Sequence, residues 1–164
     1  MMHARLLTIL CLPFLLVACS TQPGSGPAVM EASPESLIVE EAILWDSELD
    51  ENWNAVALKQ MVSDEERFKP QGMQYLVLEP LVVFGHRAAY VGVAGIHDIA
   101  GPNATLAGTP KSIAGYITKH YEAEFENRDG IYIADYKPNI KIIIEEHSEL
   151  QGGSVVIGAY VGGR

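Results

Sequence analysis

The side chains with the most distinctive chemistry in this sequence belong to two cysteines, Cys11 and Cys19, and to five histidines. Arg5 is followed by a mostly apolar run at residues 6–17. The small residue Ala18 comes next, directly before Cys19. A charged start, an apolar middle and a small-residue end are typical of a secretory signal. The apolar run is shorter than the roughly 20 residues that a membrane-spanning helix needs. Cys19 is therefore a candidate for covalent modification after export, because its thiol lies directly behind the expected cleavage site.

The four residues 16–19, Leu-Val-Ala-Cys, resemble the lipobox of bacterial lipoproteins. The resemblance implies that residues 1–18 are a signal peptide that is removed, and that Cys19 carries palmitate and other acyl chains as the first mature residue. Several such chains form a lasting anchor, since each buried methylene contributes about 0.8 kcal/mol. Ser20 stands where an aspartate would favour the inner membrane. The resemblance therefore implies lipid anchoring in the outer membrane, on its periplasmic face.

The rest of the sequence contains no local signature of catalysis or metal binding. Once Cys11 leaves with the signal, Cys19 is the single mature thiol, which excludes a disulfide, thiol catalysis and a cysteine metal cluster. The mature histidines lie outside the H-x-x-x-H and H-E-x-x-H spacings of metal sites, and no G-x-S-x-G motif marks a serine nucleophile. The neighbouring carboxylates Glu145 and Glu146 would point to opposite faces of a strand. We therefore expect no enzyme activity, no catalytic residue, no metal site and no cofactor.

Acidic residues outnumber basic residues in this chain. Lysine and arginine total 11 against 21 aspartates and glutamates, so the formal net charge is −10. Loss of Arg5 with the signal leaves 10 basic residues against the same 21 acidic ones, which gives −11 for the mature chain. Nucleic acids and anionic lipid headgroups attract basic surfaces, so we expect no nucleic-acid partner. The carboxylates are scattered, which is typical of a solvated surface and not of an acidic tail.

The chain divides into a signal, a linker and one domain. Residues 19–34 are predicted to hold the lipidated cysteine and a flexible linker, because eight of the fifteen residues in 20–34 are Pro, Gly or Ser. Residues 35–164 have the length of one ordinary domain. We expect them to form a single periplasmic β-rich domain.

Strand patterns dominate that domain. Strands are predicted at 36–44, 73–85, 88–97, 131–136, 140–147 and 154–161, the second of them bent or divided at Pro80. One helix is predicted from Pro110 to about Asn127, since Thr109 can cap it and apolar residues recur every four positions. Residues 46–62 fit either a helix or a loop followed by a strand. The predicted fold class is mainly β with one or two helices, arranged as a β-sandwich or an α+β sheet.

Two stretches of this domain resemble a known family. Residues 90–94, Tyr-Val-Gly-Val-Ala, followed by His-Asp-Ile at 97–99, are similar to a strand and a following Asp segment of the TssJ family, the outer-membrane lipoproteins of type VI secretion systems. Pro-Gln-Gly at 70–72 lies about twenty residues earlier, where that family has a Pro-Gly turn. The Trp-Arg pair that follows the Asp segment in the family is absent from this sequence.

The resemblance implies a transthyretin-like β-sandwich with added helices and a structural role. Family members anchor the secretion envelope complex to the outer membrane by binding the periplasmic domain of an inner-membrane secretion subunit. A loop between the first two strands contributes to that contact, and here it corresponds to residues 45–54. The partner-binding candidates are Trp45, Glu48, Asp50 and Trp53, with Trp53 as the anchor because exposed aromatic side chains tend to carry interface energy. The alternative is that both tryptophans pack in the core.

Three functions are compatible with the sequence. The first is a membrane-anchored structural adaptor of a cell-envelope secretion complex. The second is a stand-alone periplasmic ligand-binding or inhibitor lipoprotein. The third is a hydrolase whose catalytic residues the sequence does not identify.

Overall fold

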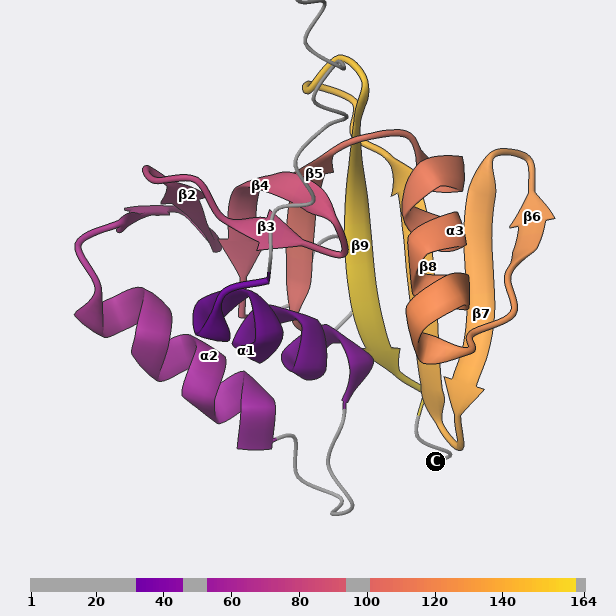
Figure 1. The fold of residues 1–164 in the computed structure, drawn as a ribbon, viewed down its shortest axis with the longest axis horizontal. Helices are drawn as coiled ribbons and strands as arrows, with labels where there is room; N and C mark the ends of the chain where they lie inside the picture. Colours follow the sequence, from indigo (N-terminus) through magenta and orange to yellow (C-terminus); the bar gives the residue numbers. More distant parts are fainter. Residues whose placement is uncertain (1–31, 46–52, 94–100, 162–164) are drawn as a thin grey trace, which may run out of the picture.

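A computed structural model describes residues 32–45, 53–93 and 101–161, apart from the side chains of residues 53 and 54. In these ranges three helices pack on one face of an antiparallel sheet (Figure 1). The elements are α1 (Pro34–Leu44), α2 (Trp53–Asp64), β1 (Phe68–Gln71), β2 (Gln74–Val77), β3 (Val82–Val83), β4 (His86–Gly92), β5 (Asn103–Ala107), α3 (Pro110–Tyr121), β6 (Glu126–Arg128), β7 (Ile131–Lys137), β8 (Ile140–Glu146) and β9 (Gly153–Tyr160).

The strands form one nine-stranded sheet in the order β1-β2-β4-β5-β9-β8-β7-β6, with β3 paired beside β4. Every strand pair is antiparallel. The predicted fold class, mainly β with helices, is confirmed. Of the two expected arrangements, a single open sheet with helices on one face corresponds to the α+β one.

The hydrophobic core lies between the helices and the sheet. Because side chains alternate along a strand, only every second residue of the central strands contributes to it. Ala104 and Leu106 of β5, Ile142 and Ile144 of β8, and Val156 of β9 are buried there. Among the described helices, none combines the length and the apolar content needed to cross a bilayer.

The prediction of a strand at 36–44 is wrong, because this segment forms helix α1. Ser33 caps the helix by accepting a hydrogen bond from the Ser36 N–H at 3.2 Å, and Pro34 occupies the first turn. The helix is apolar on more than one side because it lies between α2 and the sheet. It therefore lacks the single apolar stripe of a surface helix, and its short apolar run resembles a buried strand.

Other helix and strand boundaries also differ from the predicted ones. Of the ambiguous segment 46–62, residues 53–62 belong to helix α2 and residues 46–52 lie outside the described ranges. The strand expected at 73–85 is divided into β2 and β3 on either side of Pro80. Helix α3 ends at Tyr121, earlier than predicted, because Glu122 adopts a left-handed conformation with φ of 57°.

The end of α1 is fixed to the sheet by an unusually close backbone contact. A Cβ atom added to Gly158 of β9 would lie 1.8 Å from the carbonyl oxygen of Ile43. The indole N–H of Trp45, which ends the helix, donates to the Gly158 carbonyl oxygen at 3.2 Å. Glycine is thus required at this point of β9 for α1 to reach the sheet.

A buried carboxylate on α1 links this helix to the β3–β4 turn and to α3. Glu40 is 1% exposed. Its side chain accepts hydrogen bonds from the Phe84 N–H, at 2.5 Å, and from the Tyr121 hydroxyl of α3. Phe84 and Gly85 form the tight turn between β3 and β4 with φ of 49° and 72°. Glu40 therefore stabilises a strained turn as well as the contact between two helices.

Candidate functional site

Most residues predicted to bind a partner lie where the structure gives no side-chain description. Cys19, Glu48 and Asp50 lie outside the described residues. Trp53 begins α2, and its side chain is not described. Their roles stay predictions, and Trp45 is the one candidate whose side-chain contacts the structure describes.

Trp45 lies at the C-terminal end of α1 in a left-handed conformation with φ of 50°. Its ring stacks on that of Tyr160, with centroids 5.5 Å apart and planes 27° from parallel. Tyr160 is 49% exposed and the next residue, Val161, is 48% exposed. We call Trp45, Tyr160 and Val161 the Trp45 patch. The stacked rings are held in place and leave accessible apolar surface, which suits protein recognition.

Sequence reasoning identified Trp45 and missed the other two members of the patch. Tyr160 and Val161 belong to the strand predicted at 154–161, which gives no indication that Tyr160 stacks on Trp45. The strand alternation does place Tyr160 on the same face as Gly158, and that face receives α1. A correct helix prediction for 36–44 was the missing signal.

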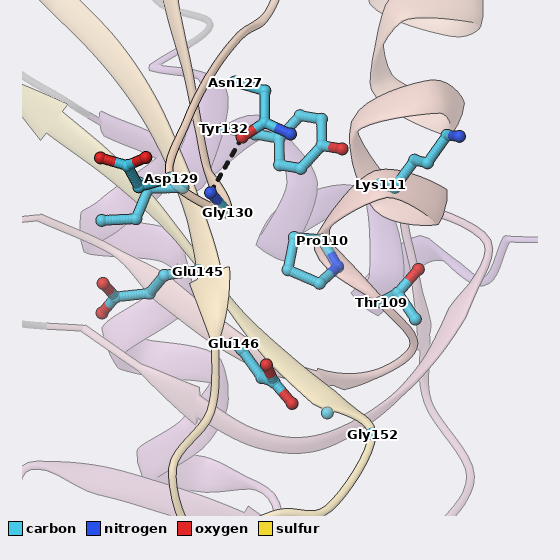
Figure 2. Close-up of a pocket in the computed structure, with 12 residues that line it drawn as sticks. Thr109, Pro110, Lys111, Asn127, Asp129, Gly130, Tyr132, Glu145, Glu146 and Gly152 are labelled. Atoms are coloured by element: carbon cyan, nitrogen blue, oxygen red, sulfur yellow. Dashed lines mark hydrogen bonds between the residues drawn. The ribbon is translucent and has the colours of Figure 1, made fainter.

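A second candidate site is an open cleft at the N-terminal end of α3, shown in Figure 2. The α3 cleft has a volume of about 510 Å³, in the range of small-molecule sites. It is lined by Thr109, Pro110, Lys111, Asn127, Asp129, Gly130, Ile131, Tyr132, Glu145, Glu146, Gly152 and Gly153. These residues come from the start of α3, the β6–β7 turn and the ends of β8 and β9.

The side chains of the α3 cleft offer an apolar wall and one inward carboxylate. In Figure 2 the Tyr132 ring points toward α3 beside Pro110, and Glu146 points toward Gly152. Glu145 and Asp129 point away from α3 in the same view. A cleft lined by both a carboxylate and an aromatic ring suits a small ligand that carries a cationic group. Within the described ranges, no group of three acidic, histidine or cysteine side chains is arranged to hold a metal ion.

Comparisons of the chain with known protein families, with curated proteins and with solved structures gave no match. The resemblance to the TssJ family therefore stays a prediction. That family's β-sandwich differs from the single open sheet of the described residues, so the architecture itself adds no support to the assignment.

Proposed function

We propose that this protein is a lipid-anchored adaptor of the bacterial cell envelope that works by binding a protein partner. The observation that carries the proposal is the Trp45 patch, in which a stacked aromatic pair is partly exposed where α1 and β9 end. Aromatic residues are enriched at protein interfaces and among the residues that dominate binding energy. The narrower form of the proposal is an adaptor of type VI secretion that binds the periplasmic domain of an inner-membrane secretion subunit.

The charge of the neighbouring sequence indicates what kind of surface the partner presents. Trp45 is followed directly by a segment that contains Asp46, Glu48, Asp50 and Glu51. A partner with an apolar pocket bordered by lysine and arginine would complement both the patch and this acidic segment. Charge complementarity of this kind increases the association rate, and salt reduces this increase because it screens the charges.

The first helix sets where the tether joins the folded domain. Ser33 caps α1, so the folded domain begins where the sequence predicts that the linker ends. The linker of about 14 residues reaches roughly 50 Å when fully extended, and it averages about 20 Å as a flexible coil. A domain held in this way can meet a partner at a distance from the membrane while staying attached.

We expect Cys19→Ala to abolish labelling by a palmitate analogue and to release the protein from the membrane fraction. The physical reason is that the acyl chains supply the entire membrane affinity of the anchor. Cys11→Ala is the matched control, because it removes the other cysteine from within the signal. Labelling that persists in Cys19→Ala would contradict the anchor assignment.

We expect Tyr160→Ala in the Trp45 patch to weaken binding of the purified periplasmic domain of the inner-membrane secretion subunit by at least about tenfold, as for a dominant interface residue. Leu78→Ala is the control, because Leu78 is similarly exposed, at 54%, and lies outside the patch. Affinity would be measured by biolayer interferometry with the lipidated chain in detergent. Equal affinity for both variants would exclude the patch as the contact surface, whereas no binding by the unaltered protein would exclude this partner.

The second candidate function is a stand-alone ligand-binding lipoprotein, and the α3 cleft favours it. Its volume and the presence of Tyr132 and Glu146 in its lining suit a small cationic ligand. Loss of partner binding in Tyr160→Ala favours the adaptor, because the α3 cleft contains no residue of the Trp45 patch.

A further inference from the structure

A serine and a histidine that are far apart in the sequence meet between β4 and the first turn of α3. His86 begins β4 and Ser112 lies in the first turn of α3. The His86 Nε2 atom lies 3.1 Å from the Ser112 Oγ atom. The other ring nitrogen, Nδ1, lies 2.6 Å from the carbonyl oxygen of Phe84. These are hydrogen-bonding distances on both sides of one imidazole ring.

The hydrogen bond to Phe84 determines which nitrogen of the neutral ring carries the proton. A carbonyl oxygen can only accept, so Nδ1 must be the donor. The neutral ring then has an unprotonated Nε2, whose lone pair faces the Ser112 hydroxyl. This is the arrangement of a nucleophile, a general base and an orienting acceptor that defines activated serine nucleophiles.

The packing around the ring holds His86 in this orientation. A Cβ atom added to Gly108 would lie 2.4 Å from Cδ2 of His86 and 3.2 Å from Oγ of Ser112. On another side the ring meets Tyr116 edge to face, with centroids 6.5 Å apart, and Tyr116 in turn stacks on His120 at 4.3 Å. Glycine at position 108 thus leaves the space that the pair occupies.

The position of Ser112 on α3 supplies the electrostatic part of such a site. Thr109 accepts the Ser112 N–H at 3.2 Å, whereas the N–H of Lys111, in the first turn, has no acceptor within the helix. The positive end of the helix dipole and this N–H favour negative charge beside Ser112. The Ser112 hydroxyl also lies 2.9 Å from the Thr109 carbonyl oxygen, so rotation about one side-chain bond directs its proton to either acceptor.

We propose that Ser112 and His86 form a nucleophile–base pair that hydrolyses carboxylic esters, a further activity beside the proposed adaptor role. Ser112 Oγ attacks the ester carbonyl carbon while its proton moves to His86 Nε2. The bond between the carbonyl carbon and the alcohol oxygen breaks, and the alcohol leaves with that proton. Water then attacks the acyl-serine, and transfer of its proton through His86 releases the carboxylic acid and restores Ser112.

The exposure of the pair indicates the class of ester. Ser112 is exposed on the helix. The open surface around it leaves room for a large alcohol group and does not enclose a long acyl chain. This favours a small acyl group carried by a large alcohol, such as an acetylated polymer, over a free long-chain ester. Gly108, which packs against the pair, donates to the Gly152 carbonyl oxygen just before β9 at 3.0 Å, whereas Tyr160 of the Trp45 patch ends β9, so the two sites lie at opposite ends of this strand.

The experiment is covalent labelling of the full chain with a fluorophosphonate probe, whose fluoride Ser112 Oγ displaces while His86 takes the proton. We expect mass spectrometry to find the label on Ser112, with none in Ser112→Ala and at least tenfold slower labelling in His86→Ala. Ser63 is the internal control, because it is exposed on α2 and its hydroxyl also bonds a backbone carbonyl, that of Lys59 at 2.8 Å. Hydrolysis of 4-nitrophenyl acetate should show the same order of rates.

A measurement on His86→Ala separates loss of the base from loss of the fold. Added imidazole should restore much of the labelling rate of this variant, since a small base can occupy the space that the ring leaves. An unlabelled wild-type protein, equal labelling of Ser63 and Ser112, or a labelling rate that is unchanged in His86→Ala would each overturn the proposal. A His86→Ala variant that stays folded in a thermal melt and is not rescued by imidazole would also overturn it.

Discussion

Gly158→Ala is expected to lower the free energy of unfolding by about 3 kcal/mol or more, the range of severe single substitutions. The added Cβ would lie 1.8 Å from the Ile43 carbonyl oxygen and 2.7 Å from its carbonyl carbon. Both are backbone atoms, so rotation of a side chain cannot relieve the clash. The end of α1 must move away from β9, which also breaks the hydrogen bond from Trp45 to Gly158. Urea unfolding followed by circular dichroism measures the change.

Gly115→Ala is the matched control for this prediction. Gly115 lies within α3, and a Cβ atom added there meets nothing within 4 Å. Alanine in the middle of a helix is favoured over glycine by roughly 0.5–1 kcal/mol, so this variant should be slightly more stable than the wild type. Similar unfolding midpoints for the two variants would mean that α1 does not approach β9 as closely as the structure shows.

Glu40→Ala is the second change with a large expected effect, a loss of about 2–4 kcal/mol in the free energy of unfolding. The substitution removes the acceptor of both the Phe84 N–H and the Tyr121 hydroxyl. Phe84 is fully buried, so water cannot readily replace the lost acceptor. Glu41→Ala is the control, because Glu41 is the exposed neighbour on the same helix.

The charge of Glu40 also makes stability depend on pH in an uncommon direction. Burial raises the pKa of Glu40 above 4.5, although the hydrogen bonds from Tyr121 and Phe84 and the charge of His120 act against that rise, and Glu41 adds to it. Burial together with Glu40 raises the pKa of Tyr121 as well. Because the folded pKa of Glu40 is raised, the folded state binds this proton more tightly than the unfolded state does. The contribution of Glu40 is then complete below pH 4.5 and is lost as pH rises through the folded pKa.

Comparison with Glu40→Gln isolates this effect from the other carboxylates. Relative to that variant, the wild type should lose stability as pH rises from about 4 to 8, since glutamine keeps an acceptor and never ionises. Urea unfolding at several pH values measures the difference. A difference that is constant across this range would mean that Glu40 does not change its ionisation between the folded and unfolded states.

The parts of the fold that the sequence predicts are those with strong local signals. The helix at α3 follows from Thr109, Pro110 and an apolar stripe, and the three C-terminal strands follow from alternation and from glycines at turns. Helix α1 was mistaken for a strand because α2 and the sheet bury it from two sides. Burial by distant elements is a tertiary effect that a local pattern does not contain.

The candidate sites were predictable to a smaller extent, for the same reason. Trp45 stood out as a large aromatic residue beside an acidic segment. His86 and Ser112 are 26 residues apart and match no local motif, and only the packing of α3 beside β4 brings them together. A nucleophile and its base are recognised by geometry and not by position in the sequence.

The central place of β9 has a consequence for how the protein matures. This strand is the last described element along the chain, yet it pairs with β5 on one side and with β8 on the other. Among the described strands, those of β1–β5 pair with none of β6–β8, so β9 is the strand that joins the two halves of the sheet. If the chain is exported as its signal predicts, it emerges amino end first, and the sheet stays divided until β9 arrives. A protein shortened at that end would display two unpaired strands, which invite aggregation and removal by proteases.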